Sequence, residues 1–487
     1  MSPTDPFRER CTDLNDAPVR SGGYILYWMQ RAQRASTNHA LEYAVRLAND
    51  RRIPLIVGFG LTADYPEASV RHYRFMLEGL AETAETLRRR GVGFVVRIGD
   101  PAAVALDLGR DASAIVCDRA YLRHPRGWRY EVARTAGCRV VEVESDLIVP
   151  VESASSKQEY AARTIRPRIH RRLGEFAMPL ESEPVVVRAA EVEPRGESLD
   201  DIPGLIARLG PRERPGAVTP FFRGGYSEAR ARLDRFLGER LRDYEENRSE
   251  PGLDLGSELS PYLHFGHISS LEVALAAGVD QFVEGLEAGR GAMKNQPGSV
   301  GVRTDASREA SSRDAFLEEL IVRRGLAHNY VWYAADYDVY GGLPGWARKT
   351  LADHRSDERE YRYTREELLA AQTHDPHWNN ATREMLLTGH MHNYMRMYWG
   401  KKILEWTDDP AEAFATTLSL NNEWFLDGRD PNSYANVAWV FGLHDRPWTE
   451  REIFGKVRYM NANGLKRKFD MDLYRAKVDR LADATEG

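Results

Sequence analysis

Apolar and polar residues alternate in two different ways along this chain, and the change falls near residue 181. In the first third, short apolar runs typical of buried strands alternate with longer segments whose apolar residues recur at helical spacing. The predicted strands are 24–28, 53–60, 93–99, 114–118 and 138–150, and the predicted helices are 36–50, 70–90, 101–109 and 125–137. This alternation predicts an α/β N-terminal domain with a doubly wound parallel sheet over residues 21–180.

Helical spacing dominates the second half of the chain. It continues from residue 221 almost to the end, so we expect an all-α C-terminal domain over 221–487. Residues 181–220 are rich in Glu, Pro, Gly and Arg, which predicts a surface linker between the domains. Residues 285–313 carry few large apolar side chains and are expected to form a mobile insert, and residues 1–20 are expected to be flexible.

Length and composition limit the class of protein but do not indicate an activity. With 487 residues and a mean hydropathy of −0.52, the chain is long enough for two or three domains and has no apolar run that could cross a membrane. The polar N-terminal residues show no signal peptide, which favours a cytoplasmic protein, associated with the nucleoid in a prokaryote. The cysteines Cys11, Cys117 and Cys138 lack metal-binding or disulfide spacing.

Several motifs of common enzyme classes are absent from the sequence. Gly91 and Gly93 precede a predicted strand rather than a helix, so the dinucleotide-binding fingerprint is not met. Neither a Walker loop nor a Gly-x-Ser-x-Gly elbow occurs. No cysteine pair accompanies the closely spaced histidines, which predict structural or helix-end residues rather than a metal site: His374, His377, His390 and His392.

Positive charge is concentrated near the C-terminus, although the whole chain carries a net charge of −6. The cations of this stretch are Arg446, Arg451, Lys456, Arg458, Lys466, Arg467 and Lys468. Aromatic side chains such as Trp448 and Tyr459 are interleaved with them. This mixture suits a groove that holds phosphates and stacks bases, whereas a solvated, charged end of the chain is the alternative.

Tryptophan is concentrated in the same half of the chain. Six of the ten tryptophans lie between Trp378 and Trp448. Trp399 and Trp406 are seven residues apart, about two helical turns, so they share one face of a predicted helix, and Trp378 lies on the helix before it. Such a cluster either fills a core or passes single electrons to a buried organic cofactor, and the pattern alone leaves both interpretations open.

The string SELSPYLHFGHIS, residues 257–269, is a candidate binding segment. Ser257 precedes a predicted helix and Ser260 lies at its start. Hydroxyl groups and free N–H groups at a helix N-terminus either bind a phosphate or simply cap the helix. Arg248, a short distance upstream, either contributes its charge to the same phosphate or faces water.

Two further groups of charged residues have alternative interpretations. Arg396 and Asp427 either form a buried ion pair or each face water. In FLEELIVRR, the apolar stripe leaves Glu318 or Glu319 near the edge of the buried helix face. A carboxyl group at that place is either a functional hydrogen-bond partner or an ordinary exposed helix glutamate.

Four longer strings carry a resemblance to a known family. These are SELSPYLHFGHIS, MHNYMRMYWGKKILEW, LDGRDPNSYANVAW and HDRPWTEREIFGKVRYM, and the N-terminal YWMQRAQRASTNHALEYA accompanies them. Together they resemble the class II cyclobutane pyrimidine dimer photolyases, in the same order and over about residues 20–475. The resemblance implies an N-terminal antenna domain and an all-helical C-terminal domain that binds FAD in a bent shape. It leaves a deazaflavin, another antenna chromophore or none as alternatives.

The resemblance also implies roles for individual residues around the flavin. Arg396 and Asp427 match an ion pair beside the isoalloxazine ring, and Asn421 matches the residue that faces N5 and suits a reduced anionic flavin, FADH⁻. The residues that match positions around the flavin phosphates are Tyr244, Arg248, Ser257, Leu259 and Ser260.

Further matches concern DNA and electron transfer. The DNA-contacting and lesion-contacting matches are Glu319, Met397, Trp439, Arg446 and Arg458. The electron-transfer matches are Trp399 and Trp378, with Trp406 on a side branch and Tyr398 nearby. The implied activity is light-driven repair of pyrimidine dimers in UV-damaged DNA by a monomer, through one electron from excited reduced FAD. The alternatives are a cryptochrome-type blue-light photoreceptor and a non-enzymatic DNA-binding flavoprotein.

Overall fold

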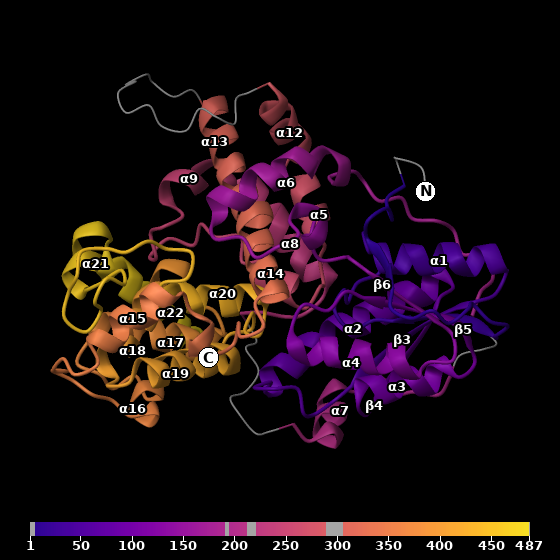
Figure 1. The fold of residues 1–487 in the computed structure, drawn as a ribbon, viewed down its shortest axis with the longest axis horizontal. Coiled ribbons are helices and arrows are strands. Elements are labelled where there is room, and N and C mark those ends of the chain that lie inside the picture. The colour runs from indigo at the N-terminus through magenta and orange to yellow at the C-terminus, as the bar shows by residue number, and fades with distance from the viewer. Residues whose placement is uncertain (1–4, 190–193, 212–220, 289–304, 487) are drawn as a thin grey trace.

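A parallel sheet forms the centre of the N-terminal lobe in the computed structural model, which describes residues 5–189, 194–211, 221–288 and 305–486 (Figure 1). The strand order is β1-β6-β5-β2-β3-β4, and every pair except β1–β6 is parallel. The strands are β1 (Cys11–Asp13), β2 (Tyr24–Trp28), β3 (Leu55–Leu61), β4 (Gly93–Ile98), β5 (Ala112–Asp118) and β6 (Arg139–Val143).

Helices cover both faces of this sheet, which confirms the doubly wound prediction. The central strands β2, β3 and β5 are buried at every residue, because both faces pack against helices. One apolar core lies under α1 (His39–Arg51) and α2 (Val70–Arg90). The other lies under α3 (Pro101–Gly109) and α4 (Arg123–Thr135).

The structure differs from the prediction of a flexible N-terminus. Cys11–Asp13 forms the antiparallel edge strand β1, in which Cys11 is opposite Val143 of β6. Arg10 is buried, and its guanidinium donates to the carbonyl oxygens of Leu147 and Ile148 at 3.0 and 2.6 Å. This short polar strand has no alternation of apolar and polar residues, so its sequence alone does not predict it and only its pairing with β6 in the structure identifies it.

The predicted surface linker and the predicted last strand also need correction. Helix α7 (Ile202–Leu209) lies inside the linker, and its leucines Leu205 and Leu209 join the core under α2. Residues 190–193 and 212–220 of that segment lie outside the described residues. Strand β6 ends at Val143 rather than continuing to residue 150, and the buried acidic side chain of Asp146 turns toward cations instead of extending the sheet.

Helices make up the part of the chain that follows β6, as Figure 1 shows. In the described residues after 221, the only β contact is an isolated bridge between Arg451 and Gly455. The helices are α5 (Val151–Ala154), α6 (Ala162–Phe176), α8 (Tyr226–Arg235), α9 (Tyr244–Asn247), α10 (Ser260–His264), α11 (Ser270–Ala276), α12 (Val279–Glu287), α13 (Asp305–Leu317), α14 (Arg324–Tyr333), α15 (Gly345–Asp353), α16 (Arg365–Leu369), α17 (Pro376–Thr388), α18 (Asn393–Trp406), α19 (Pro410–Trp424), α20 (Pro431–Val440), α21 (Ala462–Lys468) and α22 (Met471–Glu486).

Two segments whose sequence pattern is helical throughout, residues 379–406 and 314–333, are each interrupted in the structure near the candidate site. The pattern over 379–406 divides into α17 and α18 because Gly389 adopts a left-handed conformation with φ of 70°. The pattern over 314–333 contains a π-helical turn, Glu318–Arg323, between α13 and α14. The predicted insert is helical at both ends, at α12 and α13, and its residues 289–304 lie outside the described residues.

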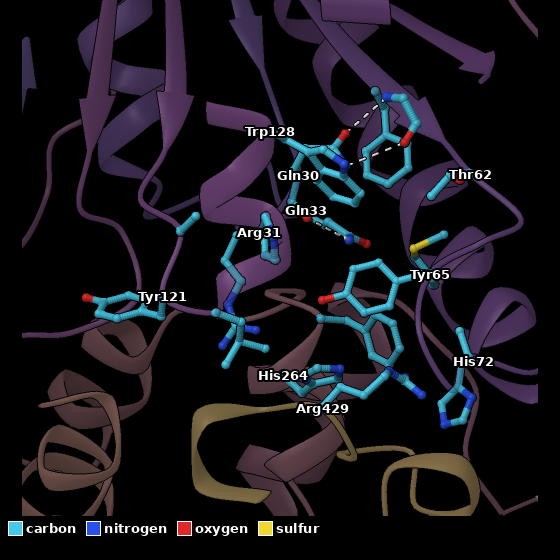
Figure 2. Close-up of a pocket in the computed structure, with 18 of the residues that line it drawn as sticks. Gln30, Arg31, Gln33, Thr62, Tyr65, His72, Tyr121, Trp128, His264 and Arg429 are labelled. Carbon is cyan, nitrogen blue, oxygen red and sulfur yellow. Dashed lines mark hydrogen bonds between the residues drawn. The ribbon is translucent and has the colours of Figure 1, made fainter. Parts of the chain in front are cut away.

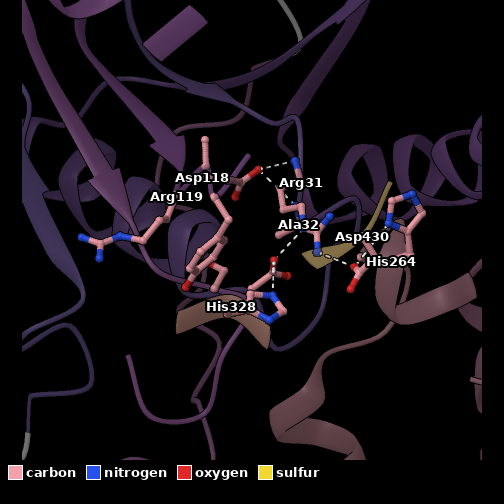
Figure 3. A network of polar contacts seen from close by, with 12 residues as sticks. Arg31, Ala32, Asp118, Arg119, His264, His328 and Asp430 are labelled. Atoms are coloured by element: carbon pink, nitrogen blue, oxygen red, sulfur yellow. Dashed lines mark hydrogen bonds and ion pairs between the residues drawn. The ribbon is translucent and has the colours of Figure 1, made fainter. Parts of the chain in front are cut away.

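A buried network of charges joins the two parts of the molecule (Figure 3). Arg31, just beyond β2, lies 2.6 Å from a carboxylate oxygen of Asp146 and 2.9 Å from one of Asp430. Arg324 and His264 also approach these carboxylates. Burial alone would raise the pKa of Asp430, but the nearby arginines hold that pKa well below its ordinary value. Asp430 is also the N-cap of α20, so this network anchors the helix.

We expect Arg31→Ala to destabilise the protein by about 3–5 kcal/mol, because it leaves two carboxylates buried without their shortest ion pair. The pKa values of Asp146 and Asp430 are lowered in the folded state. The two carboxylates therefore add to the free energy of unfolding above about pH 4, and this contribution is lost as the pH falls below that value. Urea unfolding of parent and variant at pH 7 and at about pH 2 measures both effects.

The variant should accordingly lose less stability on acidification than the parent does. Lys349→Ala is the control, since Lys349 and Asp353 form an exposed pair whose loss should leave the stability close to that of the parent. Equal stability of the parent and Arg31→Ala would contradict the structural role given to the network.

Candidate active site

Two adjoining cavities lie among the C-terminal helices, and we call them together the central cavity. Their volumes are about 270 and about 420 Å³. They adjoin because they share lining residues, namely Glu319, Asn393, Arg396, Asn432, Ser433 and Asn436. The smaller part is bordered by α10, and the larger part is bordered by α18, α19 and α20.

Arg396 and Asp427 meet in a two-point ion pair on the wall of the central cavity. Nη1 of Arg396 lies 2.9 Å from Oδ1 of Asp427, and Nη2 donates to Oδ2 at 3.2 Å. Burial tends to raise the pKa of Asp427, but Arg396 outweighs it and the pKa lies below its ordinary value. The alternative in which each side chain faces water is therefore not what the structure shows. The pair presents a fixed donor and acceptor surface to whatever binds beside it.

Asn421 of α19 presents an amide to the larger part of the central cavity. Its Nδ2 donates to Oδ1 of Asn422 at 3.3 Å, which orients the side chain. Among the described residues no group donates to Oδ1 of Asn421. The side chain is 6% exposed, so this acceptor is available to a ligand rather than to bulk water.

The segment around Ser257 lines the smaller part of the cavity, together with Tyr244, Leu259 and Ser260. The N-cap of α10 is Leu259, which makes no side-chain capping bond, so Ser257 does not act as an ordinary cap. Its hydroxyl lies 3.5 Å from the N–H of Leu259, which is too long for a strong bond. Both serines thus line the cavity, where the hydroxyl of Ser260 also interacts with the carboxylate of Asp427.

Two adjacent glutamates in the π-helical turn face different surroundings. Glu318 is buried and accepts hydrogen bonds from Arg166, the closest at 2.6 Å. Glu319 lines both parts of the central cavity and pairs with Arg248 at 2.9 Å. The structure thus places Glu319, and not Glu318, where a bound molecule could contact a carboxylate. It also brings Arg248 to Glu319, a pairing that the sequence did not indicate.

The three predicted tryptophans lie in one buried row, in which Trp378 stacks on Trp399 and meets Trp406 edge to face. Trp399 lines the cavity, and its ring centroid lies 6.1 Å from that of Trp378 with the planes 7° apart. Trp378 and Trp406 are 5.3 Å apart. Tyr398 lies outside this row: its hydroxyl is bonded to Asp375, and burial together with Asp375 raises the pKa of its phenol. No ring contact joins Tyr398 to the tryptophans in the described structure.

The aromatic row continues to the surface through residues that sequence analysis missed. The ring of Tyr363 lies 5.0 Å from that of Trp406. The hydroxyl of Tyr363 is bonded to Nδ1 of His374 at 2.7 Å, and His374 stacks on Tyr361 at 3.6 Å. Tyr361 is 37% exposed, so it ends the row at the solvent. No local spacing links residues 361–374 to Trp406, because the contact exists only in three dimensions.

A second depression, which we call the aromatic groove, adjoins the central cavity at Met397. Its lining residues are Tyr394, Met397, Trp448, Thr449, Arg451, Arg458, Tyr459, Met460 and Lys468. The guanidinium of Arg458 lies 4.5 Å from the ring of Trp448, and that of Arg446 lies 5.3 Å from it. Trp439 lines the cavity itself. Part of the predicted basic and aromatic stretch therefore lines a groove next to the central cavity, namely Arg451, Arg458, Lys468, Trp448 and Tyr459.

A further cavity, the antenna-lobe cavity, lies at the carboxyl ends of β2, β3 and β5 (Figure 2). Strand β2 has β3 on one side and β5 on the other, so this is the switch point where α/β sheets bind ligands. Aromatic rings such as Tyr65 and Trp128 line it, with several arginines. The Oε1 of Gln33 is buried there without a hydrogen-bond partner. No sequence pattern indicated this cavity.

Two searches over the described residues bear on metals and membranes. They contain no cluster of three or more His, Cys, Asp or Glu side chains arranged to hold a metal ion. His392 instead accepts from the N–H of Tyr394 at 3.2 Å and caps α18. No helix in the same residues has the length and apolar character needed to span a membrane.

The family model and the curated relatives that match this chain are photolyases, and the solved structures that match it include photolyases and a cryptochrome. The family model described as DNA photolyase matches residues 25–186. A deoxyribodipyrimidine photo-lyase of Methanothermobacter thermautotrophicus is 46% identical, with 98% of this chain and 99% of the relative covered. One from Oryza sativa subsp. japonica is 40% identical over 95% of this chain and 89% of its own length.

A solved structure shares the fold at lower identity. The archaeal photolyase from Sulfolobus tokodaii, described with two FAD molecules, matches with a TM-score of 0.62. It is 17% identical and covers 93% of this chain and 89% of its own. The likeness therefore concerns the arrangement of the two lobes.

The two glutamates of the π-helical turn should differ in their effect on stability. We expect Glu318→Gln to destabilise by about 2 kcal/mol or more, because Arg166 loses a buried charged partner. Glu319→Gln removes a partly exposed pair and should cost less than about 1 kcal/mol. Urea unfolding curves of the two variants measure the difference, and equal losses would refute the distinction.

Proposed function

The chain belongs to the DNA photolyase family, and on that basis we propose that it is a light-driven enzyme that repairs cyclobutane pyrimidine dimers in UV-damaged DNA. The class II membership suggested by the four sequence strings is part of the proposal. The observation that carries it is the central cavity, because one cavity combines the Arg396–Asp427 pair, the end of the tryptophan row and Glu319.

The residues present fit FAD. A flavin ring offers carbonyl and N–H groups along its edge, and the Arg396–Asp427 pair offers a matching donor and acceptor. The free Oδ1 of Asn421 suits an N–H group of a reduced flavin. Ser257 and Ser260 offer hydroxyl donors for phosphates in the smaller part of the cavity. Reduced FAD, when bound and excited by light, supplies the electron that splits the dimer, and the electron then returns.

The chain's own residues position the lesion and exclude water. A dimer stacks and pairs poorly, so turning it out of the duplex costs less than turning out normal bases. The cavity mouth at Met397 and Trp439 is apolar on the side next to the aromatic groove. Glu319 would hydrogen-bond a base of the dimer and stabilise the charge that develops there. The cations Arg446 and Arg458 would occupy the gap left in the duplex.

The stacked tryptophans supply a path for reducing the cofactor. Neighbouring rings in the row lie 5.3 and 6.1 Å apart between centroids, and the row leads from the cavity wall toward solvent. We propose electron flow from Trp406 through Trp378 to Trp399, with Tyr363 beyond Trp406. Tyr398 is not part of this proposal, since its ring has no contact with the row.

We further propose that the antenna-lobe cavity binds a second chromophore. Its aromatic walls suit a flat ring system, and its arginines suit an anionic one. A deazaflavin satisfies both conditions. The unpartnered Oε1 of Gln33 provides an acceptor for a ring N–H. We also propose that the protein acts as a monomer.

The principal experiment measures repair directly. Reduced protein is incubated with an oligonucleotide carrying one thymine dimer, in light and in darkness, and restored thymines are counted. Repair in light only supports the proposal. A cryptochrome-type photoreceptor would photoreduce its flavin without restoring thymines, and a DNA-binding flavoprotein would bind the oligonucleotide with neither response.

Glu319→Ala should lower repair per absorbed photon by roughly tenfold, since one charged hydrogen bond of about 1.5 kcal/mol is lost. The variant should keep its bound flavin, because its carboxylate is not one of the proposed flavin contacts. Repair yield and the flavin-to-protein absorbance ratio test the two expectations. If Glu319→Ala lost its flavin as well as its repair activity, the assignment of Glu319 to the lesion site would be wrong.

Trp399→Phe should abolish photoreduction of oxidised flavin but spare repair by chemically reduced protein. Phenylalanine keeps the ring packing and is much harder to oxidise than tryptophan. Absorbance of the flavin during illumination with an external thiol measures photoreduction. Trp346→Phe, a tryptophan outside the row, is the control. Unchanged photoreduction in Trp399→Phe would contradict the path.

A further inference from the structure

The aromatic row ends beside a histidine that the electron path proposed above does not use. Trp406 is 4% exposed, so a reductant in solution has little access to its ring. That ring contacts two residues nearer the solvent, Tyr363 at 5.0 Å and His374 at 5.5 Å between ring centroids. The outer end of the row is therefore a tyrosine and a histidine that also contact each other.

Two helix N-termini hold this pair in place. Tyr363 precedes Thr364, the N-cap of α16, and His374 precedes Asp375, the N-cap of α17. The side chains of both caps accept hydrogen bonds from N–H groups of their own helices, which fixes the backbone next to each residue. Tyr363 and His374 thus meet although α16 lies between them in the chain.

Hydrogen bonds direct the phenolic proton of Tyr363 toward the imidazole of His374. The backbone N–H of His374 donates to the hydroxyl oxygen of Tyr363 at 2.9 Å, and Nδ1 of His374 lies 2.7 Å from the same oxygen. With the ring proton on Nε2, Nδ1 is an acceptor for the hydroxyl of Tyr363. The distance falls in the range of about 2.6–3.2 Å that proton removal by a base requires.

Tyr361 holds the imidazole from its other side. The rings of Tyr361 and His374 stack at 3.6 Å with their planes 16° apart. His374 is itself exposed, so a proton that it receives can pass on to water. A surface hydrogen bond without a role in electron transfer is the alternative interpretation. The contact of both rings with Trp406 favours a role in electron transfer, and the experiment below separates the two.

We propose that His374 is the proton acceptor that allows Tyr363 to reduce an oxidised Trp406. Photoreduction takes one electron from the row and leaves Trp406 oxidised. One electron then moves from Tyr363 to Trp406, while the O–H bond of Tyr363 breaks and its proton moves to Nδ1 of His374. Trp406 is restored, Tyr363 becomes a neutral radical and His374 becomes an imidazolium ion. The inference rests on the proposed function, because it requires a bound flavin.

The proton transfer has two physical consequences. A phenol that loses an electron but keeps its proton is a very strong acid, so a base at hydrogen-bond distance makes the oxidation of Tyr363 much easier. The electron can return along the row only if the proton also returns, which slows the loss of the separated charge. An external thiolate then has time to give one electron to Tyr363 and become a thiyl radical, while His374 returns the proton.

The pH dependence of photoreduction follows from the same geometry. The charged side chains around the pair have partners of their own, which are Asp375 with the hydroxyl of Tyr398, Glu360 with the hydroxyl of Tyr361, Lys402 with Glu405 and Arg362 with Asp408. A protonated imidazole has no free acceptor for the proton of Tyr363. Photoreduction of the parent should therefore fall as the pH is lowered from about 8 to 5, the range in which imidazoles ordinarily change charge. It should also be slower in D₂O.

The principal test uses the holoprotein with oxidised flavin and an external thiol, without DNA. Transient absorption after a light flash distinguishes a neutral tyrosyl radical from a tryptophan radical. We expect the parent to form the tyrosyl radical and His374→Phe to stop at the tryptophan radical. The yield of reduced flavin in His374→Phe should fall by about tenfold or more, and its dependence on pH should disappear. Phenylalanine keeps a ring against Tyr361 but offers no acceptor.

His124→Phe is the matched control, because His124 is likewise exposed and its ring lies 4.9 Å from that of Trp128, which is outside the row. Its radical and its photoreduction should equal those of the parent. Tyr363→Phe should lose as much photoreduction as His374→Phe, and the double variant should lose no more than either, since the two residues act in one step. Equal flavin content in all variants shows that the fold is intact.

Several outcomes would overturn the inference. They are a tyrosyl radical of parent-like yield in His374→Phe, the absence of that radical from the parent, and photoreduction of the parent that changes neither with pH nor in D₂O. The last two are measured on the parent and do not depend on how well a variant folds. Chemically reduced His374→Phe should repair dimers as the parent does. A parent that forms the tyrosyl radical but repairs no dimers would count against the proposed function alone.

Discussion

The ion pairs that Arg31 forms with Asp146 and Asp430 are the contact on which the rest of the structure depends. They join the end of the first central strand to the N-terminus of α20, so the position of the sheet sets the position of a helix that lines the central cavity. Burying these charges is costly, and the cost is met only when the pairs are complete. The two lobes are thereby fixed in one arrangement, with a cavity on either side of the network.

Charges around the central cavity fall into two groups with different physical roles. Arg166 with Glu318 and Arg396 with Asp427 are neutralised within the protein, which fixes the shape of the walls. Among the described residues, Arg451 and Lys468 of the aromatic groove have no carboxylate within ion-pair distance, and they keep their attraction for an external anion. A protein of net negative charge can in this way hold a polyanion at one place and repel it elsewhere.

Sequence patterns predicted the sheet and the tryptophan row because both depend on local periodicity. The strands at 24–28 and 114–118 could be predicted because they are apolar throughout. Trp399 and Trp406 could be placed together because their spacing fits one helix face. Strand β1 was missed because three polar residues carry no period. The flavin-site and lesion-site roles came from family resemblance, and contacts such as Tyr363 with Trp406 depend on folding that spacing does not encode.

The π-helical turn at Glu318–Arg323 holds one more residue than an α-helical turn would. Deleting a single residue there would close the turn into regular α-helix and leave α13 and α14 in their present relation, because the wider turn absorbs the extra residue. Arg324 and His328, which face the buried carboxylates, would keep their places, whereas Glu318 and Glu319 could not both keep theirs in a turn that is one residue shorter. The extra residue therefore lets one turn present Glu318 to Arg166 and Glu319 to the central cavity, while Arg324 beyond the turn still reaches the buried carboxylates that join the two lobes.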